Sequence, residues 1–145
     1  YAEIRRAWRS GDHVHLRLPM PVQRVECHSY TTENAGRVAL RRGPLVYCVE
    51  GADNPGVDPR DVALPADGEW LAAWRPDLLG GVVALHGPAA VVAPGERWEG
   101  RLYRCIGRAE RQLGVAARIE LTAIPYYAWA NRQPGPMQVW LRTEG

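Results

Sequence analysis

Apolar and polar residues alternate with a period of two through much of this chain, and no stretch sustains the 3.6-residue period of an amphipathic helix. The alternation is clear at Val14, Leu16 and Leu18, which have polar residues between them. Gly and Pro number 15 and 12 among 145 residues and separate such segments. This pattern predicts an all-β fold, an antiparallel β-sandwich of the jelly-roll type.

The segments that we expect to form strands are short and are bounded by turn residues. A helical turn is expected within residues 69–79, and His86-Gly87-Pro88 is expected to separate two strands. The segment 45–50 is apolar on both faces, which is typical of a central strand covered on both sides. The expected strands are 4–8, 14–18, 22–28, 37–40, 45–50, 62–64, 82–85, 89–92, 101–106, 118–124 and 136–143.

Length and charge exclude several classes of protein. With 145 residues, 46% of them hydrophobic, the chain is long enough for one core without disulfides or a metal. The net charge is only +2 and its signs are interspersed, so no nucleic-acid partner is expected. The longest apolar or Gly stretch, 78–85, is too short to span a membrane. The chain starts at Tyr1 without Met, so we expect it to be part of a longer polypeptide.

The chain contains an odd number of cysteines, namely Cys27, Cys48 and Cys105. No two of them have C-x-x-C spacing. We expect all three to be buried, reduced thiols that act as small apolar side chains. The lack of a disulfide framework favours a reducing compartment such as the cytoplasm, although the sequence does not fix the location.

Two arrangements suggest metal ligands, and neither is convincing. His13 and His15 are two residues apart on an expected strand and would share a face, but no third ligand is evident. Acidic and amide side chains crowd the loop 51–61, yet their spacing does not match a calcium-binding loop, and Pro and Gly between them indicate turns. We therefore predict no metal site and no cofactor in this chain. The loop residues are Asp53, Asn54, Asp58 and Asp61.

A catalytic pair of carboxylates or a serine nucleophile is not indicated either. Glycosidic bond cleavage usually needs two carboxyl groups across a cleft, and sequence alone cannot place any pair there. No G-x-S-x-G motif is present. The pairs that we considered are Glu96 with Glu99 and Glu26 with Glu50.

The densest aromatic stretch, 125–132, supplies the candidate binding residues Tyr126, Tyr127, Trp129 and Arg132. Aromatic faces with nearby hydrogen-bonding groups are typical of a sugar-binding surface. The same residue types are enriched at contacts between domains, and they also suit core packing. The alternatives are distinguished by burial, because a ring inside the core cannot stack on a sugar.

This stretch, LTAIPYYAWANR, together with RGPLVYCVEG at 42–51 and the opening RAWRSGDHVHLRLPMPV, resembles the C-terminal part of glycoside hydrolase family 127, the β-L-arabinofuranosidase-like proteins. Leu79-Gly80-Gly81-Val82 and the closing MQVWL are also similar to it. The resemblance implies a parent enzyme whose N-terminal (α/α)6 barrel holds zinc through three cysteines and a glutamate, one cysteine being the nucleophile.

The family's adjacent Cys-Cys pair and Cys-x-Cys spacing are absent here, so the resemblance places no catalytic residue in this chain. It implies two small sandwich units, with 1–48 in the first, 49–136 in the second and 137–145 as a strand that returns to the first. We therefore expect a non-catalytic accessory domain that packs on the catalytic barrel of the same polypeptide and forms a homodimer. The alternative is a carbohydrate-binding module for arabinose-containing glycans that uses the aromatic stretch.

Overall fold

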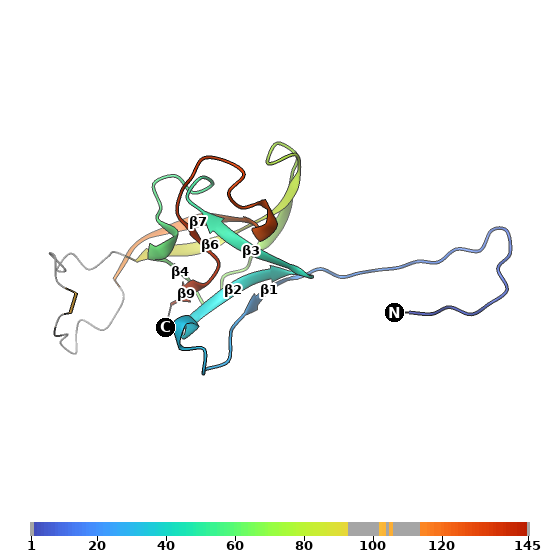
Figure 1. Ribbon diagram of the computed structural model, residues 1–145, viewed down its shortest axis with the longest axis horizontal. Coiled ribbons are helices and arrows are strands. Elements are labelled where there is room, and N and C mark those ends of the chain that lie inside the picture. The colour runs from blue at the N-terminus through green and yellow to red at the C-terminus, as the bar shows by residue number, and fades with distance from the viewer. Residues whose placement is uncertain (1, 93–101, 104, 106–113, 145) are drawn as a thin grey trace.

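The computed structural model describes residues 2–92, 102, 103, 105 and 114–144, and their regular structure is almost entirely β-strand (Figure 1). The predicted all-β class is confirmed. In chain order the elements are β1 (Val22–Val25), η1 (Thr32–Asn34), β2 (Arg37–Arg42), β3 (Leu45–Glu50), η2 (Pro59–Asp61), β4 (Val62–Leu64), β5 (Leu71–Arg75), β6 (Val82–Val92), β7 (Val115–Pro125), η4 (Tyr126–Ala128), β8 (Met137–Gln138) and β9 (Leu141–Thr143), where η marks a 3-10 turn.

Strand pairing among the described residues forms a closed circuit, which runs β2–β9–β4–β6–β7–β3 and returns to β2. Its pairings are antiparallel except that of β4 with β9, which is parallel. β1, β5 and β8 pair with β2, β6 and β3 respectively. This arrangement is compatible with a sandwich, whereas jelly-roll connectivity and the boundaries of two units remain predictions.

The main core lies within this circuit, because each of its six strands contributes buried side chains to one apolar cluster. Trp70 joins them from the segment that precedes β5. At the usual 25 cal/mol per Å² of apolar surface removed from water, such a cluster supplies most of the stability of a small domain. Its members are Leu40, Tyr47, Val49, Val62, Leu64, Trp70, Leu85, Ala89, Leu121, Ala123 and Leu141.

A second cluster covers the opposite face of β3. Side chains alternate along a strand, so Cys48 points away from Tyr47 and Val49 and packs with Val82 and Ile124 instead. The prediction that the segment 45–50 is covered on both faces is confirmed.

The expected helical turn within 69–79 is wrong, because Leu71–Arg75 is β5, paired antiparallel with Val82–His86 of β6. Pro76 does not break this strand, since it lies just beyond its end, where the chain turns. The segment Leu71–Arg75 lacks apolar-polar alternation, so its strand conformation depends on pairing with β6 and is not evident in the local pattern.

The expected break at His86-Gly87-Pro88 is also wrong, because β6 runs unbroken from Val82 to Val92. On the edge of β6 opposite β7, the residues from Val82 to His86 pair with β5, whereas Ala90 and Val91 pair with β4. Pro88 lies in the gap between these partners, where a missing N–H is tolerated. Gly87 is required by close packing, since a Cβ there would lie 2.5 Å from the Trp70 ring.

Residues 2–18, which we call the arm, extend away from the strands and fold back on themselves (Figure 1). The arm reverses direction at a turn, where the Asp12 amide donates to the Arg9 carbonyl at 3.1 Å. The two predicted strands, 4–8 and 14–18, are wrong, because the arm contains no strand. Its large apolar side chains are exposed: Ile4, Trp8, Val14, Leu16 and Leu18.

The predicted final strand, 136–143, is divided into β8 and β9 by a bend at 139–140. β8 pairs with β3, whereas β9 pairs with β2 and β4. Half of the predicted strand 101–106 lies outside the described residues, and the described positions 102, 103 and 105 are not in a strand. No helix in the described part of the chain has the length and apolar character needed to cross a membrane.

Candidate functional site

The aromatic stretch lies where β7 ends, and the structure brings its rings together on the surface. Pro125 is the last residue of β7, and the 3-10 turn η4 follows it. Residues three apart eclipse each other in a 3-10 turn, and accordingly the Tyr126 and Trp129 rings stack with centroids 5.8 Å apart and planes at 22°. Ala128 between them is buried in the second cluster and anchors the turn.

All three rings are open to solvent. Tyr126, Tyr127 and Trp129 are 45%, 66% and 40% exposed. The core-packing alternative is therefore wrong for these rings, and contact with a sugar or with another domain is sterically open to them. Which of these contacts they make remains a prediction.

The Arg132 side chain does not lie on the surface with the rings. It binds two buried carboxylates instead. Its guanidinium donates to Asp53 Oδ2 at 2.6 Å and also to Asp53 Oδ1 and Glu50 Oε2. Its side chain is 23% exposed and those of Glu50 and Asp53 are each 8% exposed. Hydrogen bonds to Asp53 and Glu50 raise the pKa of Arg132 further above its ordinary value, against the opposing effect of burial.

Glu50 also holds the loop backbone, because its Oε1 accepts from the Ala130 amide at 3.1 Å. Ala130 has a φ of 61°, a left-handed conformation that a non-glycine residue rarely adopts without support. Asn131 adds a second tie, its side-chain amide donating to the Ala128 carbonyl at 3.0 Å. The Arg132–Glu50–Asp53 network thus fixes the base of a loop whose rings point outward.

Sequence reasoning found Arg132 but missed its carboxylate partners. Glu50 is the last residue of β3, and Asp53 lies in the turn after it. These residues precede Arg132 in the sequence by 82 and 79 positions. Pairing of β3 with β7 brings the two segments together. A signal was available in the sequence, since Glu50 is the one charged residue, and the last, of a strand that is otherwise apolar.

Three of the four loop residues considered as calcium ligands, Asp53, Asn54 and Asp58, have other hydrogen-bond partners. Asp53 binds Arg132, and Asp58 accepts from the Arg60 amide at 2.9 Å and caps η2. The Asn54 side chain donates to the carbonyls of Glu50 and Thr122 at 2.8 and 2.9 Å. Among the described residues, no three His, Cys, Asp or Glu side chains are grouped as metal ligands.

Of the carboxylates considered as a catalytic pair, Glu26 and Glu50 are described, and they lie in different surroundings. Glu50 is bound to Arg132, whereas Glu26 lines a separate pocket beside Cys27 and His28. Glu96 and Glu99 lie outside the described residues.

The cysteines have three different environments, so the expectation of buried thiols holds only for Cys48. Cys27 is half-buried and Cys105 is exposed. Burial, with the charges of Glu50 and Asp53 nearby, raises the pKa of Cys48 to about 12, which makes it unreactive at neutral pH.

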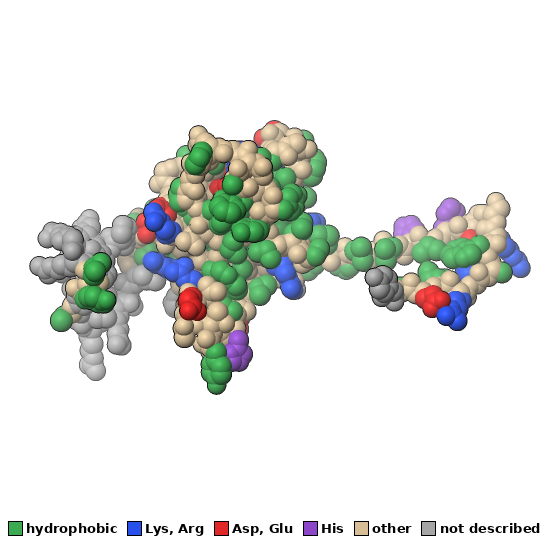
Figure 2. Space-filling view, in the orientation of Figure 1, with side chains coloured by type: hydrophobic (Ala, Val, Ile, Leu, Met, Phe, Trp, Pro, Cys, Tyr) green, Lys and Arg blue, Asp and Glu red, His purple; other side chains and the backbone are tan. Residues whose placement is uncertain are grey.

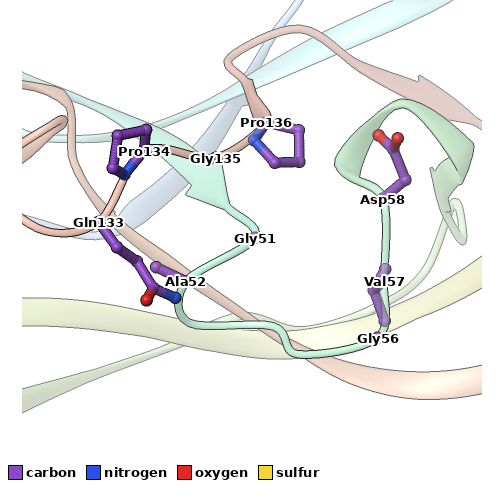
Figure 3. A pocket seen from close by; sticks show the side chains of 9 residues that line it. All are labelled: Gly51, Ala52, Gly56, Val57, Asp58, Gln133, Pro134, Gly135 and Pro136. Carbon is purple, nitrogen blue, oxygen red and sulfur yellow. The ribbon is translucent and has the colours of Figure 1, made fainter.

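A pocket of about 320 Å³ lies beside this network, between the loop after β3 and the segment before β8 (Figure 3). The Gly51 amide donates to the Pro136 carbonyl at 2.9 Å and joins the two walls. The walls offer chiefly backbone and proline surface, with Gln133 at one end and Asp58 at the other (Figure 3). Sequence reasoning did not identify this pocket, because its walls are far apart in the chain.

Taken together, the strand circuit and its surface aromatic loop define a small all-β domain. The chain belongs to glycoside hydrolase family 127, since the model of the Glycoside hydrolase family 127 C-terminal domain matches residues 22–142. The resemblance seen in the sequence motifs is thereby confirmed.

Similarity to known proteins supports this assignment. The chain is 41% identical over 131 residues to a non-reducing end β-L-arabinofuranosidase of Bifidobacterium longum, covering 88% of this chain and 19% of that protein. A family 127 β-L-arabinofuranosidase of Geobacillus stearothermophilus T6 shares 43% identity with a TM-score of 0.71, over 86% of this chain and 18% of that structure. A structure described as a glycoside hydrolase has 35% identity and a TM-score of 0.74, over 87% and 20% of the respective chains. The chain thus spans about a fifth of the length of these relatives.

Proposed function

We propose that this chain is a non-catalytic accessory domain, which packs on the N-terminal catalytic region of a β-L-arabinofuranosidase-like enzyme and self-associates. The observation that carries the proposal is the match of residues 22–142 to the model of a C-terminal domain. In agreement with it, the chain spans only about a fifth of the length of its relatives. The sequence also lacks the Cys-Cys and Cys-x-Cys motifs of the family's catalytic region.

The surface supports a role in contacts between domains. The arm exposes five large apolar side chains, and the aromatic loop exposes three rings. Such side chains gather visibly on the arm and on the body in Figure 2. Contiguous exposed apolar surface on a soluble protein usually marks an interaction site, because leaving it in water is unfavourable.

The test is an activity measurement on the 145-residue chain with an aryl β-L-arabinofuranoside, with and without added Zn²⁺. We expect no turnover, while the Geobacillus relative serves as the active control. A second measurement asks whether the chain raises the melting temperature of that relative truncated before the matching region. Zinc-dependent hydrolysis by the chain contradicts a non-catalytic role, and an unchanged melting temperature contradicts packing on the catalytic region.

A second candidate function is carbohydrate binding, which the exposure of Tyr126, Tyr127 and Trp129 favours. Aromatic faces stack on sugars, and Tyr127 has the most open ring of the three. Arg132 is held by Glu50 and Asp53, so in this candidate it positions the loop and does not contact the sugar.

Titration calorimetry with arabino-oligosaccharides separates the two candidates. Sugar binding predicts saturable heat that Tyr127→Ala abolishes and that the control Tyr30→Ala, at an 89% exposed residue outside the loop, leaves unchanged. Absence of saturable heat with the unmodified chain rejects the carbohydrate-binding candidate and leaves the accessory role standing.

A further inference from the structure

The pocket beside the Arg132–Glu50–Asp53 network has two walls that this network joins (Figure 3). Glu50 and Asp53 lie on either side of the wall residues 51–52 in the sequence, and Arg132 directly precedes the opposite wall, 133–136. The hydrogen bonds from the guanidinium to both carboxylates therefore connect one wall to the other. A ligand entering the pocket does not have to order these walls, which lowers the entropic cost of binding.

The lining of the pocket offers hydrogen-bond acceptors in excess of donors. Pro134 and Pro136 have no N–H, so the wall 133–136 has four backbone carbonyls and only two backbone amides. The exposed side chain of Gln133 adds a carbonyl and an NH2 group. The two proline rings supply apolar surface next to these polar groups (Figure 3). Such a lining fits a carbon ring with several hydroxyl groups, which donate to the carbonyls while the C–H surface covers the prolines.

The charges at the pocket favour a neutral ligand over a cation. Asp58 is the charged residue of the described lining, and its carboxylate accepts from the Arg60 amide at 2.9 Å and from Arg60 Nε at 3.0 Å. These hydrogen bonds lower the pKa of Asp58 to about 2, so the carboxylate is ionised at neutral pH and paired with the guanidinium. The carboxylate oxygens of Glu50 and Asp53 also all accept hydrogen bonds. A cation would compete with partners already in place, whereas a hydroxyl group needs no counter-charge.

We propose that this pocket binds one neutral sugar residue, a pentose at the end of an oligosaccharide whose next residues stack on the rings of the aromatic loop. The volume of about 320 Å³ lies at the lower end of the range of about 300–1,000 Å³ for ligand sites, which suits a single small ring. Trp129 precedes Gln133 by four residues, which span at most about 14 Å, so the rings and the pocket are within reach of one short oligosaccharide. This inference rests on the carbohydrate-binding candidate and assigns the place where the end of its ligand lies.

The first experiment follows the backbone amide signals of the ¹⁵N-labelled 145-residue chain by NMR during titration with L-arabinose. We expect saturable shifts at Ala52, Gly56 and Gly135, which line the pocket. The dissociation constant should lie in the millimolar range, because a ligand of about ten non-hydrogen atoms gains little binding free energy. Titration with CaCl2 tests for a cation site and should leave these signals unchanged. Shifts with Ca²⁺ and none with L-arabinose overturn the proposal.

Substitutions in the lining test whether the sugar occupies the pocket itself. Ala52→Leu places a larger side chain in the lining and should weaken L-arabinose binding at least about tenfold. Its matched control is Ala66→Leu, at an exposed alanine of another turn, which should leave binding unchanged. Gln133→Ala removes the side-chain amide and should weaken arabinotriose binding about tenfold in titration calorimetry. Gln23→Ala, at an exposed glutamine of β1, is the control. Circular dichroism of each variant establishes that the fold is retained.

The outcomes distinguish the pocket from the carbohydrate-binding candidate as a whole. The expected result is saturable heat with arabinotriose that Tyr127→Ala, Ala52→Leu and Gln133→Ala all reduce. Heat that Tyr127→Ala abolishes but that both pocket variants leave unchanged overturns the pocket proposal and leaves sugar binding by the rings standing. Absence of saturable heat with the unmodified chain overturns both.

Discussion

Leu16 in the arm is 77% exposed, whereas Leu121 in β7 is fully buried, although both belong to segments in which apolar and polar residues alternate. β7 has a partner on each edge, β6 on one side and β3 on the other. The arm has a turn stabilised by Asp12 but pairs with no described strand. Alternation therefore shows that a segment can form a half-buried strand, and a partner edge decides whether it does.

The strongest test of this comparison removes one leucine from each region. Leu121→Ala leaves a cavity in the main core and should lower the free energy of unfolding by about 2–5 kcal/mol. Leu16→Ala removes no packing from the body and should change it by less than about 0.5 kcal/mol. Urea denaturation followed by circular dichroism measures both. Equal losses for the two variants would mean that the arm packs on the body in solution.

The second test compares ion pairs, which are present in both the arm and the body. Arg132→Met leaves Glu50 and Asp53 without a cation in a buried site, and should cost about 2–3 kcal/mol because an uncompensated buried charge is unfavourable. The matched variant in the arm is Arg6→Met, which removes an exposed pair with Asp12 at 3.0 Å and should cost less than about 0.5 kcal/mol. A comparable loss for the two variants, measured by urea denaturation, would contradict a structural role for the Arg132 network.

A Gly→Ala substitution in each region tests the difference between body and arm by adding a Cβ atom instead of removing a contact. Gly87→Ala places a Cβ 2.5 Å from the Trp70 ring, and should cost about 1–3 kcal/mol through overpacking of the core. Gly11→Ala has no atom within 4 Å of the new Cβ, so any backbone strain that it causes stays in the turn of the arm. Thermal unfolding should show a lower midpoint for Gly87→Ala only. An unchanged midpoint would indicate that Trp70 moves aside at little cost.

The fold class could be predicted from the sequence because alternation is a local signal. The segment 45–50 was predicted with its bounds, and the segment 118–124 lies within β7. The errors at β5 and β6 have different causes: Leu71–Arg75 shows no apolar-polar alternation, and the proline in β6 indicates a break unless the partner edges are known. Pro88 is tolerated only because the opposite edge changes partner there, and that is a tertiary fact.

The candidate site could be predicted only in part for a similar reason. Composition identifies Tyr126, Tyr127 and Trp129 as rings able to bind, and exposure agrees with that use. The partners of Arg132 could not be found, because Glu50 and Asp53 reach it through the pairing of β3 with β7. The local sequence marks Glu50 as the charged end of an apolar strand, but it does not identify Arg132 as its partner.

Alkaline pH should affect the body and not the arm, because Cys48 lies in the second cluster and residues 2–18 contain neither cysteine nor tyrosine. The pKa of the Cys48 thiol is raised from 9.0 to about 12 in the folded protein, chiefly by burial. The unfolded chain therefore releases this proton first, so the thiol's contribution to stability is complete below pH 9 and is lost as pH rises toward 12. Between pH 8 and pH 10 the free energy of unfolding should fall by about 1 kcal/mol from this group.

Cys48→Ala should flatten that dependence, with the remaining slope coming from groups such as Tyr47, whose pKa burial also raises. Urea denaturation at the two pH values measures the difference, and an equal slope in the wild-type chain and Cys48→Ala would show that the thiol ionises in the folded state as readily as in the unfolded one.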